Sequence, residues 1–213
     1  MRAELADPTS DRVIEVLELA YERGGTILRP ILEDLIEATA RDVKLLDAIV
    51  SLANETRKES QAEIEFAVIG RQADQESDFF VLGHDSRLGQ VVRNLLDNGR
   101  SFTAPGSRLS VRVRRAGPDV EFRVDDSGPG IRPDNLERIF ERFYTDRPEG
   151  SFGSNSGLGL SISKQIVEAH KGRIWAENRY GPAGADGGRT VLGARFVVRI
   201  PAVDDDWREP KKP

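Results

Sequence analysis

Two glycines, Gly157 and Gly159, stand at the start of an amphipathic helical pattern in SNSGLGLSISKQIVEAH, residues 154–170. Glycine costs about 1 kcal/mol relative to alanine inside a helix, so the pair must serve something other than helix stability. Backbone N–H groups at a helix start attract anions, because they lack partners and the helix dipole favours negative charge there. One interpretation is therefore an anion site, and a flexible loop that joins its helix is the alternative.

Two asparagines, Asn94 and Asn98, lie four residues apart in the helical pattern DSRLGQVVRNLLDNGRSF, for which Asp85 or Ser86 is the predicted cap. Their amides therefore project from one face of the helix. The oxygen of Asn98 suits Mg²⁺, which proteins usually hold with few oxygens of their own beside waters and phosphates. A polar helix surface is the alternative, because asparagine is common there.

A third feature is the stretch DDSGPGI, where Asp126 ends a predicted strand and Gly128 and Gly130 follow it. A carboxylate at a strand end can accept a hydrogen bond from the exocyclic amine of adenine, and the glycines allow a planar group to approach. An ordinary tight turn is the alternative, because Asp, Ser, Gly and Pro are the usual turn residues.

The fourth feature, IFERFYTDRPEG, carries Phe140, Phe143 and Tyr144, which we predict to anchor one end of a mobile loop. Arg142 and Arg147 can then reach phosphates. The alternative is a helix end that packs its aromatic side chains on the core, and this holds for Phe140 in either case.

The polar segment from Thr145 to Ser156 follows these aromatic residues and is rich in glycine and serine. Its length is typical of functional or disordered loops. We expect it to act as a lid that a bound γ-phosphate orders, because few apolar residues are available to offset its conformational entropy.

The composition of the 213-residue chain restricts the classes of function. Its net charge is −5, which does not indicate a nucleic-acid surface, and no apolar run approaches the roughly 20 residues of a membrane span. We expect no secretory signal in MRAELADPTSDR. The absence of cysteine excludes disulfides and thiolate metal sites, and the two histidines, His84 and His170, exclude a histidine-rich metal centre.

The elements that must position these residues change in type near residue 62. Helical spacing dominates the first sixty residues, including VKLLDAIVSLANETRKES. Strands are then predicted at 62–68, 78–83, 109–116, 120–126, 173–179 and 194–201, and helices at 85–102, 134–144 and 157–170. This order predicts an α/β fold of the α+β sandwich type. Its sheet is mixed and mostly antiparallel with helices on one face, and an N-terminal helical segment precedes it.

In this order, the four features resemble the boxes of the catalytic and ATP-binding domain of sensor histidine kinases, in the GHKL superfamily with its Bergerat fold. NLLDN resembles the N box, DDSGPGI the G1 box, IFERFY the F box and SGLGLSI the G2 box. The resemblance covers residues 45–203 and is closer still to alphaproteobacterial envelope sensor kinases of the ChvG/BvrS type. It implies a catalytic domain at 45–203. Apolar spacing predicts a helical segment at 1–44 that self-associates as a homodimer, and the composition of DDDWREPKKP predicts a disordered tail at 204–213.

The resemblance also implies residue roles, with ATP and Mg²⁺ as cofactors. Asp126 would bind the adenine amine, Asn98 would hold Mg²⁺ together with Asn94, and Asn94 would line the phosphate side. Nucleotide contacts are implied for Gly128, Gly130, Ile131, Tyr144, Gly157, Leu158, Gly159 and Leu160. ATP-hydrolysing relatives carry Glu at the position of Asn94, and an amide has no useful basicity. We therefore expect phosphoryl transfer, with Asn94, Arg142 and Arg147 as the catalytic residues.

The sequence departs from a complete sensor kinase because it lacks the H box that carries the acceptor histidine. We expect a turn or capping role for His84 and contacts with helix-end carbonyls for His170. The acceptor histidine would lie on a dimerisation domain outside this chain, with a response regulator as the further partner. The chain would then be the cytoplasmic part of an inner-membrane sensor kinase.

Two other functions are open from the sequence. The first is a nucleotide-binding or degenerate module that docks a response regulator without kinase activity. The second is a hydrolase with a pair formed by His84 and Asp85, but the sequence contains no nucleophile elbow, P-loop or Rossmann fingerprint to accompany it.

Overall fold

The computed structural model describes residues 41–59, 62–69, 79–144, 157–184 and 187–203. Three predicted features lie outside these residues, namely the helices before residue 41, the lid from Thr145 to Ser156 and the C-terminal tail.

A five-stranded sheet forms one layer of the fold, with the strand order β2-β4-β5-β7-β6. The strands are β2 (Glu63–Ile69), β4 (Arg108–Ala116), β5 (Asp119–Asp125), β6 (Arg173–Ala183) and β7 (Arg189–Pro201). β2 pairs with β4 in parallel, and the other three pairs are antiparallel. This arrangement confirms the predicted mixed, mostly antiparallel sheet.

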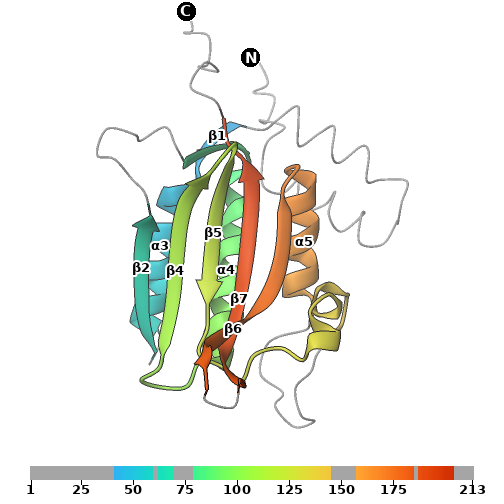
Figure 1. The fold of residues 1–213 in the computed structure, drawn as a ribbon. Coiled ribbons are helices and arrows are strands. Elements are labelled where there is room, and N and C mark those ends of the chain that lie inside the picture. Colours follow the sequence, from blue (N-terminus) through green and yellow to red (C-terminus); the bar gives the residue numbers. More distant parts are fainter. Residues whose placement is uncertain (1–40, 60–61, 70–78, 145–156, 185–186, 204–213) are drawn as a thin grey trace, which may run out of the picture.

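Three helices, α3 (Leu45–Glu59), α4 (Asp85–Phe102) and α5 (Gly159–Ala169), form the second layer. Figure 1 shows α3 and α4 behind the sheet and α5 along its β6 edge. The inward side chains of β5, Val120, Phe122 and Val124, alternate with polar residues and are at most 1% exposed. They face the buried side of α4, formed by Leu88, Val91, Val92, Leu95 and Leu96. The predicted two-layer sandwich is therefore confirmed.

A smaller sheet joins the start and the end of the described fold. β1 (Arg41–Lys44) pairs antiparallel with β3 (Phe80–Gly83). β3 also receives the chain that leaves β7, because Val81 forms a bridge with Ala202 and the N–H of Val203 donates to the carbonyl oxygen of Phe80 at 2.9 Å. The prediction of helix at 41–44 was wrong, because these residues form β1.

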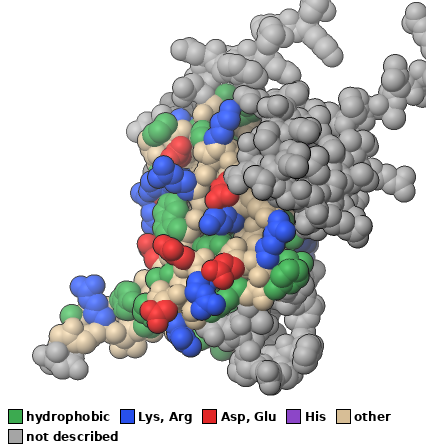
Figure 2. Space-filling view, turned by 90° about the vertical axis from the view of Figure 1, so that its right-hand side faces the viewer, with side chains coloured by type: hydrophobic (Ala, Val, Ile, Leu, Met, Phe, Trp, Pro, Cys, Tyr) green, Lys and Arg blue, Asp and Glu red, His purple; other side chains and the backbone are tan. Residues whose placement is uncertain are grey.

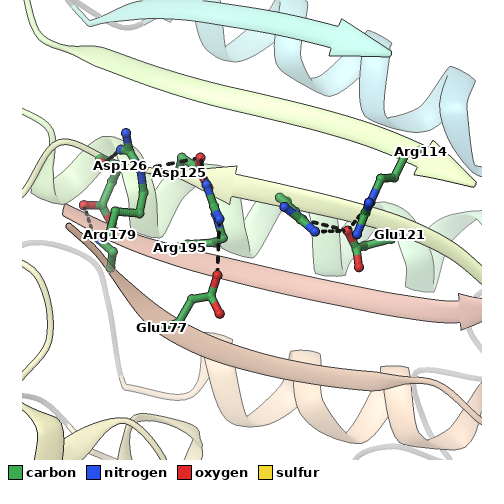
Figure 3. Close-up of polar contacts among 9 residues, drawn as sticks. Arg114, Glu121, Asp125, Asp126, Glu177, Arg179 and Arg195 are labelled. Atoms are coloured by element: carbon green, nitrogen blue, oxygen red, sulfur yellow. Dashed lines mark hydrogen bonds and ion pairs between the residues drawn. The ribbon is translucent and has the colours of Figure 1, made fainter. Parts of the chain in front are cut away.

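The other face of the sheet carries charged side chains, and at its centre Glu121 is fully buried. Its carboxylate accepts hydrogen bonds from the Nε atoms of Arg114 at 2.7 Å, Arg123 at 2.6 Å and Arg199 at 2.6 Å. Figure 3 shows Arg114 of β4 beside Glu121 of β5. Burial alone would raise the pKa of Glu121, but the hydrogen bonds from Arg114 and Arg199 and the charge of Arg123 lower it to about 2.

The side of the molecule on which α5 lies is shown in Figure 2. Basic and acidic side chains intermingle on the described part of this face, with hydrophobic side chains between them. Within the described residues, no helix is both long enough and apolar enough to span a membrane.

Candidate functional site

A cavity of about 660 Å³ lies between α4, the turn after β5 and the first turn of α5. Its size is typical of small-molecule sites. The predicted site residues that line it are Asn94, Asn98, Asp126, Gly130, Ile131, Tyr144, Gly157, Leu158, Gly159 and Leu160. The fold thus brings together residues from all four sequence features, which are up to 66 positions apart in the chain when counted from Asn94 to Leu160.

Asp126 is the buried carboxylate of this cavity, with only 2% of its surface exposed. The N–H groups of Gly128 and Ala194 both donate to its Oδ1 at 2.9 Å. Burial raises the pKa of Asp126, and these two hydrogen bonds oppose the rise. Because both bonds end on Oδ1, Oδ2 is left for a hydrogen-bond donor in the cavity.

Asn94 and Asn98 line the cavity from one side of α4, as their spacing predicted. The Nδ2 of Asn94 donates to the carbonyl oxygen of Gly159 at 3.0 Å and to the Oγ of Ser163 at 3.2 Å, which ties α4 to α5. The Oδ1 of Asn94 takes part in neither bond. Two neutral amide oxygens on one helix face suit a hard cation that keeps waters and phosphate oxygens as its other ligands.

The first turn of α5 presents backbone donors to the cavity. Its N-cap residue is Leu158, and within the described part of the chain no side chain caps the helix. N–H groups without a capping partner are the usual property of an anion site at a helix start. Gly159 has room for a Cβ atom, which would lie 3.6 Å from Asn94, so packing does not require glycine there.

Gly157 has a different role, because its φ angle is +69° and a Cβ atom would lie 2.9 Å from the carbonyl oxygen of Tyr144. Backbone conformation and close packing therefore explain this glycine. Gly128 likewise approaches the chain of α4, since a Cβ atom would lie 2.8 Å from the carbonyl oxygen of Phe102. Gly128 does not line the cavity, and it contributes through its N–H bond to Asp126.

The aromatic segment differs from the predicted single helix at 134–144. It forms two short 3-10 turns, η3 (Pro133–Asn135) and η4 (Arg138–Phe140). Phe140 is buried, as predicted, but Phe143 is 72% exposed and has a φ angle of +61°. The prediction that Phe143 is an apolar anchor was therefore wrong, because the backbone turns its side chain away from the core.

The two predicted phosphate-binding arginines are not part of the described cavity. Arg142 is exposed and does not line it, whereas Arg147 lies outside the described residues. Tyr144 does line the cavity, and the guanidinium of Arg138 lies 5.2 Å from its ring centre.

Sequence reasoning missed the apolar wall of the cavity, to which Phe102, Ile162 and Phe196 contribute. Phe102 ends α4 one turn after Asn98, and Ile162 lies one turn after Leu158. Helical spacing from the predicted site residues would have found both. Phe196 comes from a strand far along the chain and carries no such signal.

Neither His84 nor His170 lines the cavity. They contact each other where the start of α4 meets the end of α5. His84 is the N-cap residue of α4, so the predicted cap at Asp85 or Ser86 was wrong, and its backbone N–H lies 3.4 Å from the Nε2 of His170. The Nδ1 of His170 lies 2.7 Å from the carbonyl oxygen of Ile166, which confirms the predicted contact with the end of α5. Burial lowers the pKa of His170.

Comparisons with known proteins agree with this geometry. Residues 83–204 match the family described as histidine kinase-, DNA gyrase B-, and HSP90-like ATPase. The sensor protein ChvG of Rhizobium meliloti is 44% identical over 92% of this chain and 35% of its own length. The sensor-like histidine kinase SenX3 of Mycobacterium tuberculosis is 31% identical over 98% of this chain and 45% of its own length. The chain therefore spans less than half of either relative.

Among solved structures, a mycobacterial sensor histidine kinase, MprB, superposes with a TM-score of 0.61 at 30% identity. The superposition covers 77% of this chain and 98% of that one. The catalytic domain of the histidine kinase ThkA gives a TM-score of 0.60 at 24% identity, a similarity of fold.

Proposed function

The chain belongs to the family of histidine kinase-, DNA gyrase B-, and HSP90-like ATPases. We propose that it binds Mg·ATP in this cavity and transfers the γ-phosphoryl group of ATP to a histidine. The acceptor would lie on a dimerisation domain outside the described fold. The predicted resemblance to sensor histidine kinase catalytic domains is confirmed by the relatives and by the fold. The comparisons favour this role over that of a degenerate docking module.

The observation that carries the proposal is the hydrogen bonding of the Asp126 carboxylate in the cavity. A buried carboxylate with two backbone donors on Oδ1 offers Oδ2 to one further donor, and the 6-amino group of adenine is such a donor. The side chains of Phe102, Ile131 and Phe196 would cover the apolar faces of the base.

The opposite end of the cavity suits the triphosphate. The uncapped first turn of α5 would bind phosphate oxygens, and the side-chain oxygens of Asn94 and Asn98 would hold Mg²⁺. The bound ion would neutralise phosphate charge during transfer. Phosphoryl transfer depends mainly on such positioning and charge neutralisation.

Asn94 favours transfer over hydrolysis. Its Nδ2 is held by Gly159 and Ser163, so its amide is fixed at the joint between α4 and α5. An amide in this place cannot accept a proton from water at neutral pH. The site would therefore keep ATP intact until an acceptor histidine arrives.

The organisation of the longer protein is part of the same proposal. Residues 45–203 would act as the catalytic domain on the cytoplasmic side of a sensor kinase, and the predicted helical segment before β1 would self-associate. A response regulator would receive the phosphoryl group from the acceptor histidine. The support is the similarity of the chain to the sensor protein ChvG and to the sensor-like histidine kinase SenX3.

The proposal is tested by measuring intact mass after incubation with Mg·ATP, with and without a separate sensor-kinase dimerisation domain that carries an acceptor histidine. We expect no modification of this chain alone, slow phosphate release, and one acid-labile phosphoryl group on the acceptor. An acceptor domain without its phosphorylatable histidine is the control. Rapid phosphate release, or a phosphohistidine mapped to His84, would refute the proposal.

A further inference from the structure

The turn from Asp126 to Ile131 forms one side of the cavity and has no helix or strand structure of its own. It carries the carboxylate, the Gly128 N–H that holds this carboxylate, and the side chain of Ile131. Two of its six residues are glycines, which leaves the isolated turn with high conformational freedom. Its shape must therefore be fixed by neighbouring elements.

Asn178 of β6 fixes one end of this turn through both groups of its amide. Its Oδ1 accepts the N–H of Ile131 at 2.7 Å, and its Nδ2 donates to the carbonyl oxygen of Ile131 at 2.6 Å. The side chain thus pairs with Ile131 as a neighbouring strand would. Because both backbone groups of Ile131 are used, the residue offers the cavity its apolar side chain alone.

Gly130 permits this contact. Its φ angle is +81°, and a Cβ atom would lie 2.8 Å from the Oδ1 of Asn178 and 2.5 Å from the Cγ1 of Val191. The turn therefore lies directly against β6 and β7 at this point. The glycine that the sequence suggested for a nucleotide serves the contact with Asn178.

Arg179, the next residue of β6, fixes the other end of the turn. Its Nη1 donates to the carbonyl oxygen of Asp126 at 2.7 Å, and its Nε lies 3.6 Å from the Oδ2 of Asp125. Figure 3 shows Arg179 reaching Asp126, and Arg195 beside it on Asp125. Arg195 binds Asp125 through two hydrogen bonds, at 2.7 and 2.8 Å.

We infer that Asn178 is a positioning residue that sets the preference of the cavity for adenine over bases without an exocyclic amine. The inference rests on the proposed function. Arg179 holds Asp126 at the strand end, so loss of Asn178 would release the Ile131 end alone. Gly128, which lies between these ends, would then no longer hold Oδ1 in place. The carboxylate would keep the Ala194 N–H as its single backbone donor and could rotate away from the amine.

The test compares the affinities of the chain for Mg·ADP and Mg·IDP by calorimetry, because inosine carries an oxygen in place of the 6-amino group. The wild-type chain is expected to prefer ADP. Asn178→Ala is expected to weaken ADP about five- to tenfold and IDP much less, which corresponds to one net hydrogen bond. Arg173→Ala, at an exposed position of the same strand, is the matched control and is expected to keep the wild-type ratio.

A purely structural role would reduce both affinities equally, so an unchanged ADP to IDP ratio in Asn178→Ala would overturn the inference. No ADP binding by the wild-type chain would instead overturn the proposed function, and the inference with it. Asn178→Asp is a second variant of the same shape. It keeps the oxygen that accepts the Ile131 N–H and loses the NH₂ group that donates to the Ile131 carbonyl oxygen. We expect its preference for ADP over IDP to be reduced as in Asn178→Ala. Hydrogen exchange supplies a test that needs no variant. The Ile131 amide should exchange slowly in the nucleotide-free chain, and unprotected exchange would overturn the inference.

Discussion

Replacing Asp126 with asparagine would remove the negative charge of this residue and keep the shape of its side chain. Asparagine keeps an oxygen that can accept the N–H groups of Gly128 and Ala194, so the turn should keep its structure. In place of Oδ2, however, it presents an NH₂ group to the amine of adenine, and two donors then face each other. The variant should therefore fold normally and bind ADP poorly.

The size of this loss follows from the bond that disappears. A hydrogen bond to a charged partner contributes about 1.5–3 kcal/mol, so ADP should bind about 10- to 150-fold more weakly. The free energy of unfolding, in contrast, should be higher in the variant than in the wild-type chain. Since burial raises the pKa of Asp126 in the fold, its ionisation lowers the free energy of unfolding as the pH rises through that pKa. The asparagine variant has no carboxyl group to ionise at this position, so its free energy of unfolding should not show this decrease with pH.

Calorimetry with Mg·ADP and urea unfolding over a pH series would measure both effects. IDP is the comparison ligand, because the asparagine NH₂ group can donate to the oxygen that replaces the 6-amino group, so the variant should bind IDP at least as tightly as the wild-type chain does. An ADP affinity within twofold of wild type, in a variant that remains folded, would show that Asp126 does not contact the base.

Two further predictions concern stability. Glu121→Gln should lower the free energy of unfolding by about 2–3 kcal/mol at neutral pH, because its pKa falls from 4.5 to about 2 in the fold and its arginine partners are partly exposed. This difference from wild type should shrink as the pH falls below 4.5, and urea unfolding that shows a constant difference at acid pH would contradict the assignment. Gly157→Ala should destabilise the chain by about 1–2 kcal/mol because of its positive φ, whereas Gly159→Ala should stabilise α5 by up to about 1 kcal/mol. Thermal unfolding that ranks the two variants in the reverse order would refute this distinction.

Local patterns in the sequence predicted the elements that position the site. The helix predicted at 85–102 has the observed bounds of α4, and the alternation around Val120 and Phe122 identified β5 and its inward face. These predictions succeeded because hydrophobic periodicity is set by the core that each element buries. The spacing of Asn94 and Asn98 then placed both side chains on the cavity side of α4.

Features that depend on distant partners were not predictable. β1 has four residues and one buried apolar side chain, Val43, and it is a strand because β3 pairs with it. Alternation placed Glu121 on the polar face, but its burial comes from arginines on β4, β5 and β7. The sequence likewise marked Gly130 as permissive without showing that its neighbour would be Asn178, 48 positions later.

The pairing of β3 with both β1 and the residues after β7 has a mechanical consequence. Residue 41 begins the strand that pairs with β3, and Val203 bonds to Phe80 at the start of β3, so the chain enters and leaves the described fold beside the same short strand. Tension between residues 41 and 203 would therefore act first on the hydrogen bonds of β3, and not on those of the five-stranded sheet. The cavity at the far end of α4 could then keep its shape while pulling or torsion reorients the whole domain as a rigid body.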